Sequence, residues 1–388
     1  MLTVEDCSEP VAFERLRPDW IALENSLFPR TPFASPLWHE TWWRHLRRQS
    51  WHTKDELALY SVRDESGRLF AVAPFMKSTH PGIGPLRISQ LQGIGADPHI
   101  TELRGLVCHA QNTLPAIAVL KSHFIKVYPR VSWITWNNVL HLQSDDNRQP
   151  LSADRSHAFF WKRPQPAYIL EMPDTWTLFE SGLTKKVRKK LRSCSNLLQR
   201  DNHNATLNVV GEPVAVAVSL RIFYDLVARR SQVRHADPFS SPKVQDFFND
   251  FATRSSEGHV LRIFELRVGQ EVVASRIGFA LGSELYLYHS GNLPAWDQYS
   301  IMTALLAEIF KWAILQGFRH VNLSTGLDRS KTRWRPREII YQDAVDVMPG
   351  RINAAIHRTF DRVKSRKTAA QSLAPGCPNA LIDSHNCE

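Results

Sequence analysis

The chain has 388 residues, of which 43% are hydrophobic and 22% charged, and this is the composition of an ordinary globular protein. A chain of this length exceeds the usual size of one hydrophobic core, so we expect two domains. The formal net charge of +10 favours an anionic partner, which is nucleic acid, a membrane surface or a phosphorylated small molecule. No apolar run approaches the roughly 20 residues that a membrane-spanning helix needs, so we expect a soluble protein.

The five cysteines are widely spaced and form no C-x-x-C pair, so we interpret them as free thiols in a reducing compartment and expect no metal site. They are Cys7, Cys108, Cys194, Cys377 and Cys387. The first ten residues, "MLTVEDCSEP", are acidic and lack the apolar core of a signal peptide. We therefore expect a cytoplasmic location.

In the first half, apolar periodicity predicts a strand, two helices, three strands, a helix and a strand. These segments are, in turn, 2–7, 11–28, 36–48, 56–64, 68–78, 86–93, 113–127 and 131–137.

The second half repeats this order, and one further strand follows at 337–347. The repeated segments are 205–210, 213–232, 243–254, 259–267, 271–281, 284–290, 299–318 and 319–324. In the long helix of this half, Ser300 is the predicted N-cap and Gly317 the predicted C′ residue.

The repeated order indicates an internal duplication. We predict an α/β (α+β) protein of two tandem domains, each with a mixed, mostly antiparallel sheet flanked by helices. The predicted domains are 1–165 and 166–349, with a polar loop at 145–157 near their boundary. A basic helix and a disordered tail are predicted for 350–388.

Standard phosphate-binding and hydrolase motifs are absent from the sequence. There is no G-x-x-x-x-G-K-S/T, no H-E-x-x-H, no G-x-S-x-G and no full G-x-G-x-x-G. The sequence therefore gives little support to classification as a P-loop enzyme or as a standard hydrolase.

A basic tract occupies six of eight positions in the stretch "TKKVRKKLR", and we call these six residues the basic tract. They are Lys185, Lys186, Arg188, Lys189, Lys190 and Arg192. One helical face carries Leu183, Val187, Leu191, Cys194 and Leu198, so the tract belongs to an amphipathic helix that packs on the protein. Its cations either form a solvated face or bind the phosphates of a ligand, RNA or acidic lipid.

The segment between the strand at 284–290 and the long helix ends at Tyr299, Ser300 and Ile301. The free N–H groups at a helix N-terminus and the positive end of its dipole suit a pyrophosphate. An ordinary capped helix is the alternative.

From about Ala167 to Pro336 the chain resembles the bacterial BioF2-like, or CelD-like, acetyltransferase family. This family is a branch of the GNAT superfamily and is related to the FemABX peptidyltransferases. The resemblance is carried by "AYILEMPDTWTLFESGLTKKVRKKLRSCSNLLQR", "VASRIGFALGSELYLYHSGNLPAWDQYS" and "GFRHVNLSTGLDRSKTRW", and "FASPLWHETWWRHL" resembles the N-terminal segment of the family.

The resemblance implies two GNAT-like domains, with acetyl-CoA or another acyl-CoA as co-substrate bound in the second. The strands at 284–290 and 319–324 would separate around the pantetheine arm, and the helix from Ser300 would receive the pyrophosphate. A backbone N–H near Tyr288 to Ser290 would polarise the thioester carbonyl. The implied donor-binding residues are Ser290, Gly291, Tyr299, Ser300, Ile301 and Gly326.

Four residues are candidates for catalysis. Asp328 would be the base or would orient the acceptor, or is only a turn residue. Lys331 would hold an acceptor carboxylate or phosphate, or is a solvated charge. Tyr288 and His289 lie at a strand end where acid–base groups are useful, although strand aromatics usually belong to the core.

Two departures from the family pattern bear on these roles. Ile301 and Met302 replace small residues at the helix entrance, and Ser330 stands where the family has Tyr.

Three functions remain open at this point. The first is an acyl-CoA-dependent N- or O-acyltransferase, acting on an amine or hydroxyl of a sugar, polysaccharide or cell-envelope precursor. The second is a FemABX-like transferase that uses aminoacyl-tRNA, with the basic tract as its RNA contact. The third is a non-catalytic binding module that keeps the GNAT fold.

Overall fold

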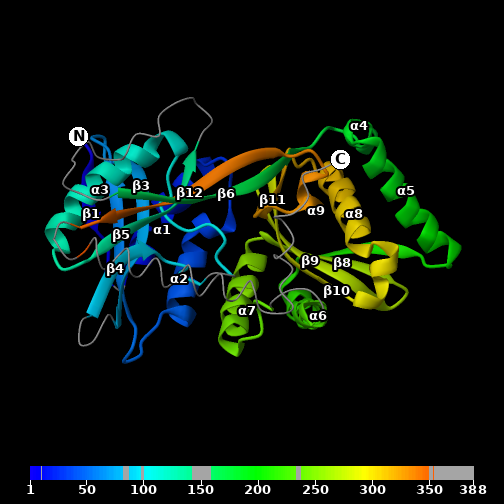
Figure 1. Ribbon diagram of the computed structural model, residues 1–388, viewed down its shortest axis with the longest axis horizontal. Coiled ribbons are helices and arrows are strands. Elements are labelled where there is room, and N and C mark those ends of the chain that lie inside the picture. Colours follow the sequence, from blue (N-terminus) through cyan, green and yellow to red (C-terminus); the bar gives the residue numbers. More distant parts are fainter. Residues whose placement is uncertain are drawn as a thin grey trace, which may run out of the picture.

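The computed structural model describes residues 1–9, 11–81, 87–97, 100–141, 159–232, 237–348 and 353. Its centre is a 12-stranded sheet with the order β1-β2-β3-β4-β5-β12-β6-β11-β10-β9-β8-β7. Figure 1 shows this sheet running through both halves of the molecule, so the chain forms one continuous layer of strands. The predicted loop at 145–157 and the predicted segment 350–388, apart from residue 353, lie outside the described residues.

The first half has the predicted order of elements. It contains β1 (Thr3–Asp6), α1 (Ala12–Ser26), α2 (Pro36–Leu46), β2 (Lys54–Arg63), β3 (Leu69–Pro81), β4 (Arg87–Gly93), α3 (Thr113–Val127) and β5 (Trp133–His141), with short 3₁₀ turns at Pro32–Ala34 and Ala110–Asn112. Alternating apolar residues make β2 to β4 an antiparallel meander, and β4 pairs in parallel with β5.

The second half repeats this order and adds two helices before it. It contains α4 (Trp176–Gly182), α5 (Lys185–Arg200), β7 (Ala205–Val210), α6 (Pro213–Ser231), α7 (Pro242–Glu257), β8 (Leu261–Val268), β9 (Glu271–Leu281), β10 (Glu284–Asn292), a 3₁₀ turn (Pro294–Tyr299), α8 (Ile301–Leu315), β11 (His320–Thr325) and α9 (Arg329–Thr332). The fold prediction is therefore confirmed as a mixed α/β protein built on a mostly antiparallel sheet.

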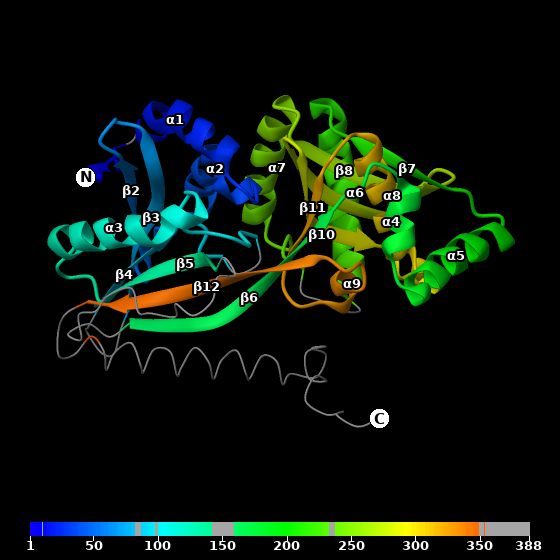
Figure 2. The same cartoon turned by 90° about the horizontal axis from the view of Figure 1, so that it is seen from above.

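Two long strands join the halves. β6 (Phe159–Glu171) pairs with β11 of the second half, and β12 (Arg337–Val347) pairs with both β6 and β5. Figure 2 shows β6 and β12 lying side by side from one half to the other. The predicted boundary between residues 165 and 166 falls inside β6, and β12 completes the sheet of the first half although the prediction placed it in the second. The halves consequently share strands.

Buried side chains form one core that crosses between the halves. Trp38 of α2 packs edge-on against Phe247 and Phe251 of α7, with ring centroids 5.2 and 4.7 Å apart. Other large buried rings of this core are Trp20, Phe223 and Tyr288. A second core under α8 and α5 belongs to the second half alone, and a third under α3 belongs to the first. Burial of large aromatic rings across the junction stabilises the relative position of the halves.

The predicted amphipathic helix is confirmed as α5. Thr184 caps it by accepting a hydrogen bond from the Val187 amide, and Val187, Cys194 and Leu198 are buried beneath it. Among the described residues, no helix is long and apolar enough to cross a membrane.

Candidate functional site

Strands β10 and β11 separate soon after they begin. They pair in parallel only from Glu284↔His320 to Tyr286↔Asn322. Beyond that point the register of β10 shifts between Leu287 and Ser290, while β11 remains paired with β6 as far as Thr325. The separation that the family resemblance implied is therefore present.

A cavity of ≈ 370 Å³ lies where these strands separate, and we call it the central pocket. It is bounded by β9, β10, β11, the end of α6, the first turns of α8, and α9. Its polar lining residues are Glu102, Arg230, Ser231, Arg276, Tyr288, His289, Ser290, Ser324, Thr325, Asp328, Ser330, Lys331 and Arg333. The fold thus brings together all four predicted catalytic residues and Ser290.

Asp328 forms the N-cap of α9. Its carboxylate accepts hydrogen bonds from the Ser330 amide at 2.7 Å and the Ser330 hydroxyl at 2.8 Å. Burial alone would raise the pKa of Asp328, but the bonds from Ser330 and the charge of Lys331 outweigh it and lower the pKa. The two hydrogen bonds from Ser330 thus favour the ionised form of the Asp328 carboxylate.

Lys331 reaches back along the same segment. Its ammonium donates a hydrogen bond to the carbonyl of Thr325 at the end of β11. Burial lowers the pKa of Lys331 because the charged form loses hydration, and nearby Glu102 acts in the opposite direction. The side chain is thus part of the pocket wall and not a solvated loop charge.

Tyr288 and His289 have different environments. Tyr288 is buried, donates its hydroxyl proton to the carbonyl of Ile100, and has a pKa raised well above its usual range, chiefly by burial. The His289 ring lies half-buried against Phe239, with centroids 5.3 Å apart, and lines the pocket. Tyr288 is consequently a structural link to the first half, whereas His289 faces the cavity.

Ser290 and Gly291 lie in the irregular part of β10. The Ser290 carbonyl and hydroxyl accept hydrogen bonds from Arg230 at 3.1 and 3.0 Å. A Cβ at Gly291 would lie 2.5 Å from the backbone nitrogen of Val227 in α6. Glycine is therefore needed there for close packing of helix on strand.

The helix entrance differs in detail from the prediction. Ser300 occupies the N-cap position with φ 54° and ψ 45°, but its hydroxyl caps no backbone amide. Tyr299 donates a hydrogen bond from its hydroxyl to the carboxylate of Asp201 at 2.8 Å. The side chain of Ile301, the first residue of α8, is fully buried. The side chains of Tyr299 and Ile301 are thus engaged within the protein, and from the first turn of α8 the residue that lines the central pocket is Met302.

Gly326 begins the turn from β11 into α9. It has φ +92°, which favours glycine, and its amide donates to the carbonyl of Pro166 at 2.8 Å. Gly326 thus shapes the turn that carries Asp328 and Lys331 and is not among the residues that line the pocket.

The basic tract is divided between two environments. Lys186, Lys189 and Lys190 line a cavity of ≈ 850 Å³ between α5 and α9, together with Arg329, Arg333 and Arg335. We call this cavity the cationic groove, and it shares Ser330 and Arg333 with the central pocket. The remaining members of the tract, Lys185, Arg188 and Arg192, lie outside its lining.

Sequence reasoning missed a third cavity, on the other side of the central pocket. This cavity of ≈ 330 Å³ lies between the halves, shares Glu102, His289 and Thr325 with the central pocket, and contains the carboxylates of Asp97 and Asp343. We call it the acidic pocket. No local signal in the loop "DPHITELRG" marks Glu102, because that loop reaches the second half only through the fold.

Arg276 was also missed. It lies within the apolar strand β9 and lines the central pocket. A charged residue inside such a strand was the only available signal. The described residues contain no cluster of three or more His, Cys, Asp or Glu side chains able to hold a metal ion.

Residues 185–332 match the family model described as an acetyltransferase (GNAT) domain. That segment contains α5, all of α9 and the residues that line the central pocket apart from Glu102 and Arg333. This match supports the GNAT assignment made from the sequence for the segment that it covers.

The solved structure of FemX resembles the whole chain, with a TM-score of 0.56 at 10% identity, and covers 88% of this chain and 98% of that one. L-PGS from Bacillus licheniformis has a TM-score of 0.46 at 14% identity, with 80% of this chain and 90% of that one covered. A tandem GNAT protein from the clavulanic acid biosynthesis pathway has a TM-score of 0.44 at 10% identity, with 90% and 100% covered. No curated protein matches the sequence. The FemX likeness shows that the fold of both halves is shared with that protein.

Proposed function

We propose that the protein transfers an acyl group from acyl-CoA to an amine or a hydroxyl. The observation that carries this proposal is the separation of β10 and β11 past Tyr286 and Asn322, with a cavity between them and the N-terminus of α8 beside it. The pantetheine arm occupies the separation. The GNAT match of residues 185–332 supports a transferase of this type.

The donor phosphates bind between the first turn of α8 and the cationic groove. The first amides of a helix lack intrahelical partners and, with the helix dipole, attract phosphate. Arg333 donates a hydrogen bond to the Thr303 hydroxyl at 3.1 Å and so lies across that turn, and Lys190 lines the groove beside it. These two cations supply charge-assisted hydrogen bonds to the phosphates.

The reaction is direct transfer from the thioester, and positioning makes the main contribution. A backbone amide near Ser290 polarises the thioester carbonyl. Asp328 is ionised but occupied by Ser330, so we assign it the role of orienting the α9 segment and Lys331. The acceptor enters from the acidic pocket, which meets the central pocket at Glu102 and His289.

Calorimetry with acetyl-CoA tests the donor site. We expect the double substitution Lys190→Gln and Arg333→Gln to raise the dissociation constant by roughly tenfold or more, because charge-assisted hydrogen bonds to phosphate are lost. The matched control is Lys185→Gln with Arg192→Gln, which removes two cations of the same helix that do not line the groove. Absence of acyl-CoA binding by the wild-type protein would overturn the proposal.

A FemABX-like use of aminoacyl-tRNA is the second candidate, favoured by the cations of α5. RNA would contact the whole exposed tract, so the control pair would weaken binding as much as the groove pair, with a steep dependence on salt. The BioF2-like subfamily and a sugar, polysaccharide or cell-envelope acceptor stay predictions from the resemblance. Acyl-CoA-dependent release of thiol would exclude a non-catalytic module.

A further inference from the structure

Arg276 is a half-buried cation whose fully buried Nε lacks a partner among the described residues. It lies in the middle of β9, opposite Ser290 of β10, and lines the central pocket. Its buried Nε has no hydrogen-bond partner, and no ion pair between described residues includes it. Burial, with a further contribution from Arg230, lowers the pKa of Arg276 to about 10, which leaves it charged at neutral pH. An unpaired buried charge is destabilising, so its presence points to a ligand.

The other charged groups around Arg276 are each engaged. Among the residues lining the pocket, Arg230 donates to Ser290, Lys331 to Thr325 and Arg333 to Thr303. The carboxylate of Asp328 accepts from Ser330. The Nε of Arg333 is also buried without a hydrogen-bond partner, but its Nη2 donates to Thr303. Among the described cations that line the pocket, Arg276 is thus the one for which neither a hydrogen bond nor an ion pair is found.

Glu102 brings a carboxylate of the first half to the same cavity. Its Oε2 accepts hydrogen bonds from the hydroxyls of Tyr286 and Ser324, the latter at 2.7 Å. Among the described residues no hydrogen bond reaches its Oε1. Two buried hydroxyls thus fix the Glu102 carboxylate where the central and acidic pockets meet.

Arg276 and Glu102 attract each other electrostatically, yet they are not an ion pair within 4.0 Å in the described part of the chain. The bonds from Tyr286 and Ser324 hold the carboxylate, and the strand holds the guanidinium. Opposite charges fixed apart in one cavity are complementary to a molecule that carries both an ammonium and a carboxylate.

We propose that the acyl acceptor is a small amine that carries a carboxylate, such as an amino acid, with the carboxylate bound by Arg276 and the amine by Glu102. This assignment rests on the acyl-transfer function proposed above. Glu102 takes one proton from the ammonium, and the freed nitrogen attacks the thioester carbonyl carbon. The C–N bond forms, the C–S bond breaks, the second proton leaves with the CoA thiol, and Glu102 releases its proton to water. The products are an N-acyl amino acid and CoA.

The test measures the rate of thiol release from acetyl-CoA with each of the twenty amino acids as acceptor. For each amino acid, the rate is compared with the rates for its amide and for the corresponding amine without a carboxylate. The wild-type protein is expected to favour an acid over its amide by about 100-fold, because a site built to bind one polar group rejects an analogue without it. Equal rates for acid and amide, or no turnover with any amino acid, would overturn the proposal. Preference for phosphoethanolamine over every amino acid would also overturn it.

Arg276→Gln is expected to remove this preference while leaving the dissociation constant of acetyl-CoA within about threefold of wild type, and Arg276→Lys to restore part of it. The control Arg221→Gln removes an exposed cation of α6 and should change neither quantity. The wild type and Arg276→Gln are also compared with succinyl-CoA and acetyl-CoA as donors. If the wild type prefers succinyl-CoA and Arg276→Gln loses that preference, Arg276 binds a carboxylate of the donor, which contradicts the proposal. Because the wild-type comparison needs no variant, it stands even where Arg276→Gln fails to fold.

Calorimetry with acetyl-CoA distinguishes a failure of the acceptor assignment from a failure of the proposed acyltransferase function. Acetyl-CoA binding without discrimination between acid and amide contradicts only the acceptor assignment. No acetyl-CoA binding contradicts the acyltransferase function, and the acceptor assignment falls with it.

Discussion

The two halves contain the same strand separation, but only one of them keeps a large cavity there. In the first half, β4 and β5 pair in parallel from Gln90↔Trp133 to Gln92↔Thr135 and then diverge, as β10 and β11 do in the second. The cavity beside β5 in the first half is ≈ 100 Å³, against ≈ 370 Å³ for the central pocket. Element order alone therefore does not determine which half binds a ligand.

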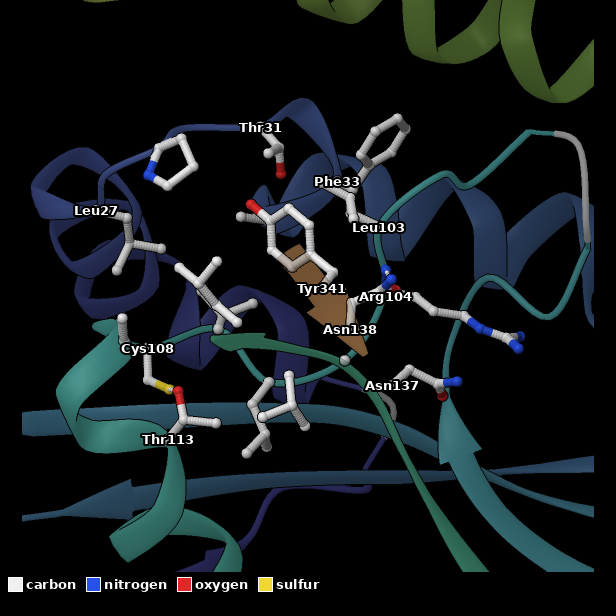
Figure 3. A pocket seen from close by; sticks show the side chains of 18 of the residues that line it. Leu27, Thr31, Phe33, Leu103, Arg104, Cys108, Thr113, Asn137, Asn138 and Tyr341 are labelled. Atoms are coloured by element: carbon white, nitrogen blue, oxygen red, sulfur yellow. Dashed lines mark hydrogen bonds between the residues drawn. The ribbon is translucent and has the colours of Figure 1, made fainter. Parts of the chain in front are cut away.

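The backbone around Gly105 fills the separation in the first half, because a Cβ at Gly93 of β4 would lie 3.0 Å from the Gly105 nitrogen and one at Gly105 would lie 2.3 Å from the Asn137 carbonyl oxygen of β5. Figure 3 shows the ring of Tyr341, which comes from β12, lying between Phe33 and the segment that carries Cys108. Arg104 extends away from this cavity. Burial raises the pKa of the Cys108 thiol to about 11, so the thiol is protonated at neutral pH. The first-half cavity is thus part of a packed core.

The first half instead contributes a wall to the site of the second. The segment between β4 and α3 reaches across the junction, where Ile100 accepts a hydrogen bond from Tyr288 and Glu102 accepts from Tyr286. The corresponding segment of the second half is short and ends at the α8 entrance. Although the two halves have the same order of elements, the central pocket lies in the second half and the first half contributes Glu102 to its lining.

The largest expected effect comes from placing a larger side chain in the central pocket, compared with the same kind of change in the first-half cavity. Ser290→Phe places a ring in the central pocket, and we expect the catalytic efficiency with acyl-CoA to fall by about 100-fold or more because the pantetheine arm is displaced. Cys108→Leu fills the first-half cavity, and we expect a change of less than about threefold. Steady-state kinetics of both variants decides this, and equal losses would contradict the assignment of the donor site to the second half.

A smaller effect concerns the packing of α6 on β10. Gly291→Ala forces a Cβ to within 2.5 Å of the Val227 nitrogen, and overpacking of this kind costs about 1–3 kcal/mol of unfolding free energy. Gly182→Ala is the matched control, since a Cβ there meets nothing within 4 Å. Urea denaturation measures both changes. A Gly291 variant as stable as the control would show that α6 can move away from the pocket at little cost.

An effect of similar size, limited to one pH range, is expected at the junction of the halves. Glu284 of β10 is buried and accepts hydrogen bonds from the Arg30 amide at 3.2 and 3.1 Å; burial raises its pKa from 4.5 to about 7. Between these values the folded protein binds more protons than the unfolded chain, so the free energy of unfolding falls as pH rises from about 4.5 to 7.

Glu284→Gln is expected to remove this part of the slope, a change on the order of 1–3 kcal/mol between pH 5 and pH 8. Denaturation at both pH values measures it, with Glu257→Gln, an exposed residue at the end of α7, as the control. An unchanged slope in the Glu284 variant would mean that this carboxyl titrates alike in both states.

Much of the fold could be predicted from local patterns. Apolar alternation located the meanders of both halves, and the spacing of Val187, Cys194 and Leu198 located α5 with its buried face. Gly317 ends α8 with φ +77°, as its position after the periodic run predicted. Residues of the site could be predicted from the sequence where they lie together in one short segment, as Asp328 and Lys331 do.

Glu102 and Arg276 show why the remainder was not predicted. Each is an ordinary polar residue in its own segment, and only long-range pairing brings them to one cavity. The roles of Ile301 and Tyr299 were likewise decided by packing, because the helix face on which a side chain lies depends on what covers it.

The sequence by itself determined the order of the elements, its repetition in the two halves and the match of residues 185–332 to a GNAT domain, because periodicity and short motifs are local properties of the chain. The tertiary structure alone decided that β6 and β12 join both sheets, that the first-half separation is filled, and that the first half supplies Glu102 to the site of the second. These outcomes depend on contacts between residues far apart in the chain, which no local pattern specifies.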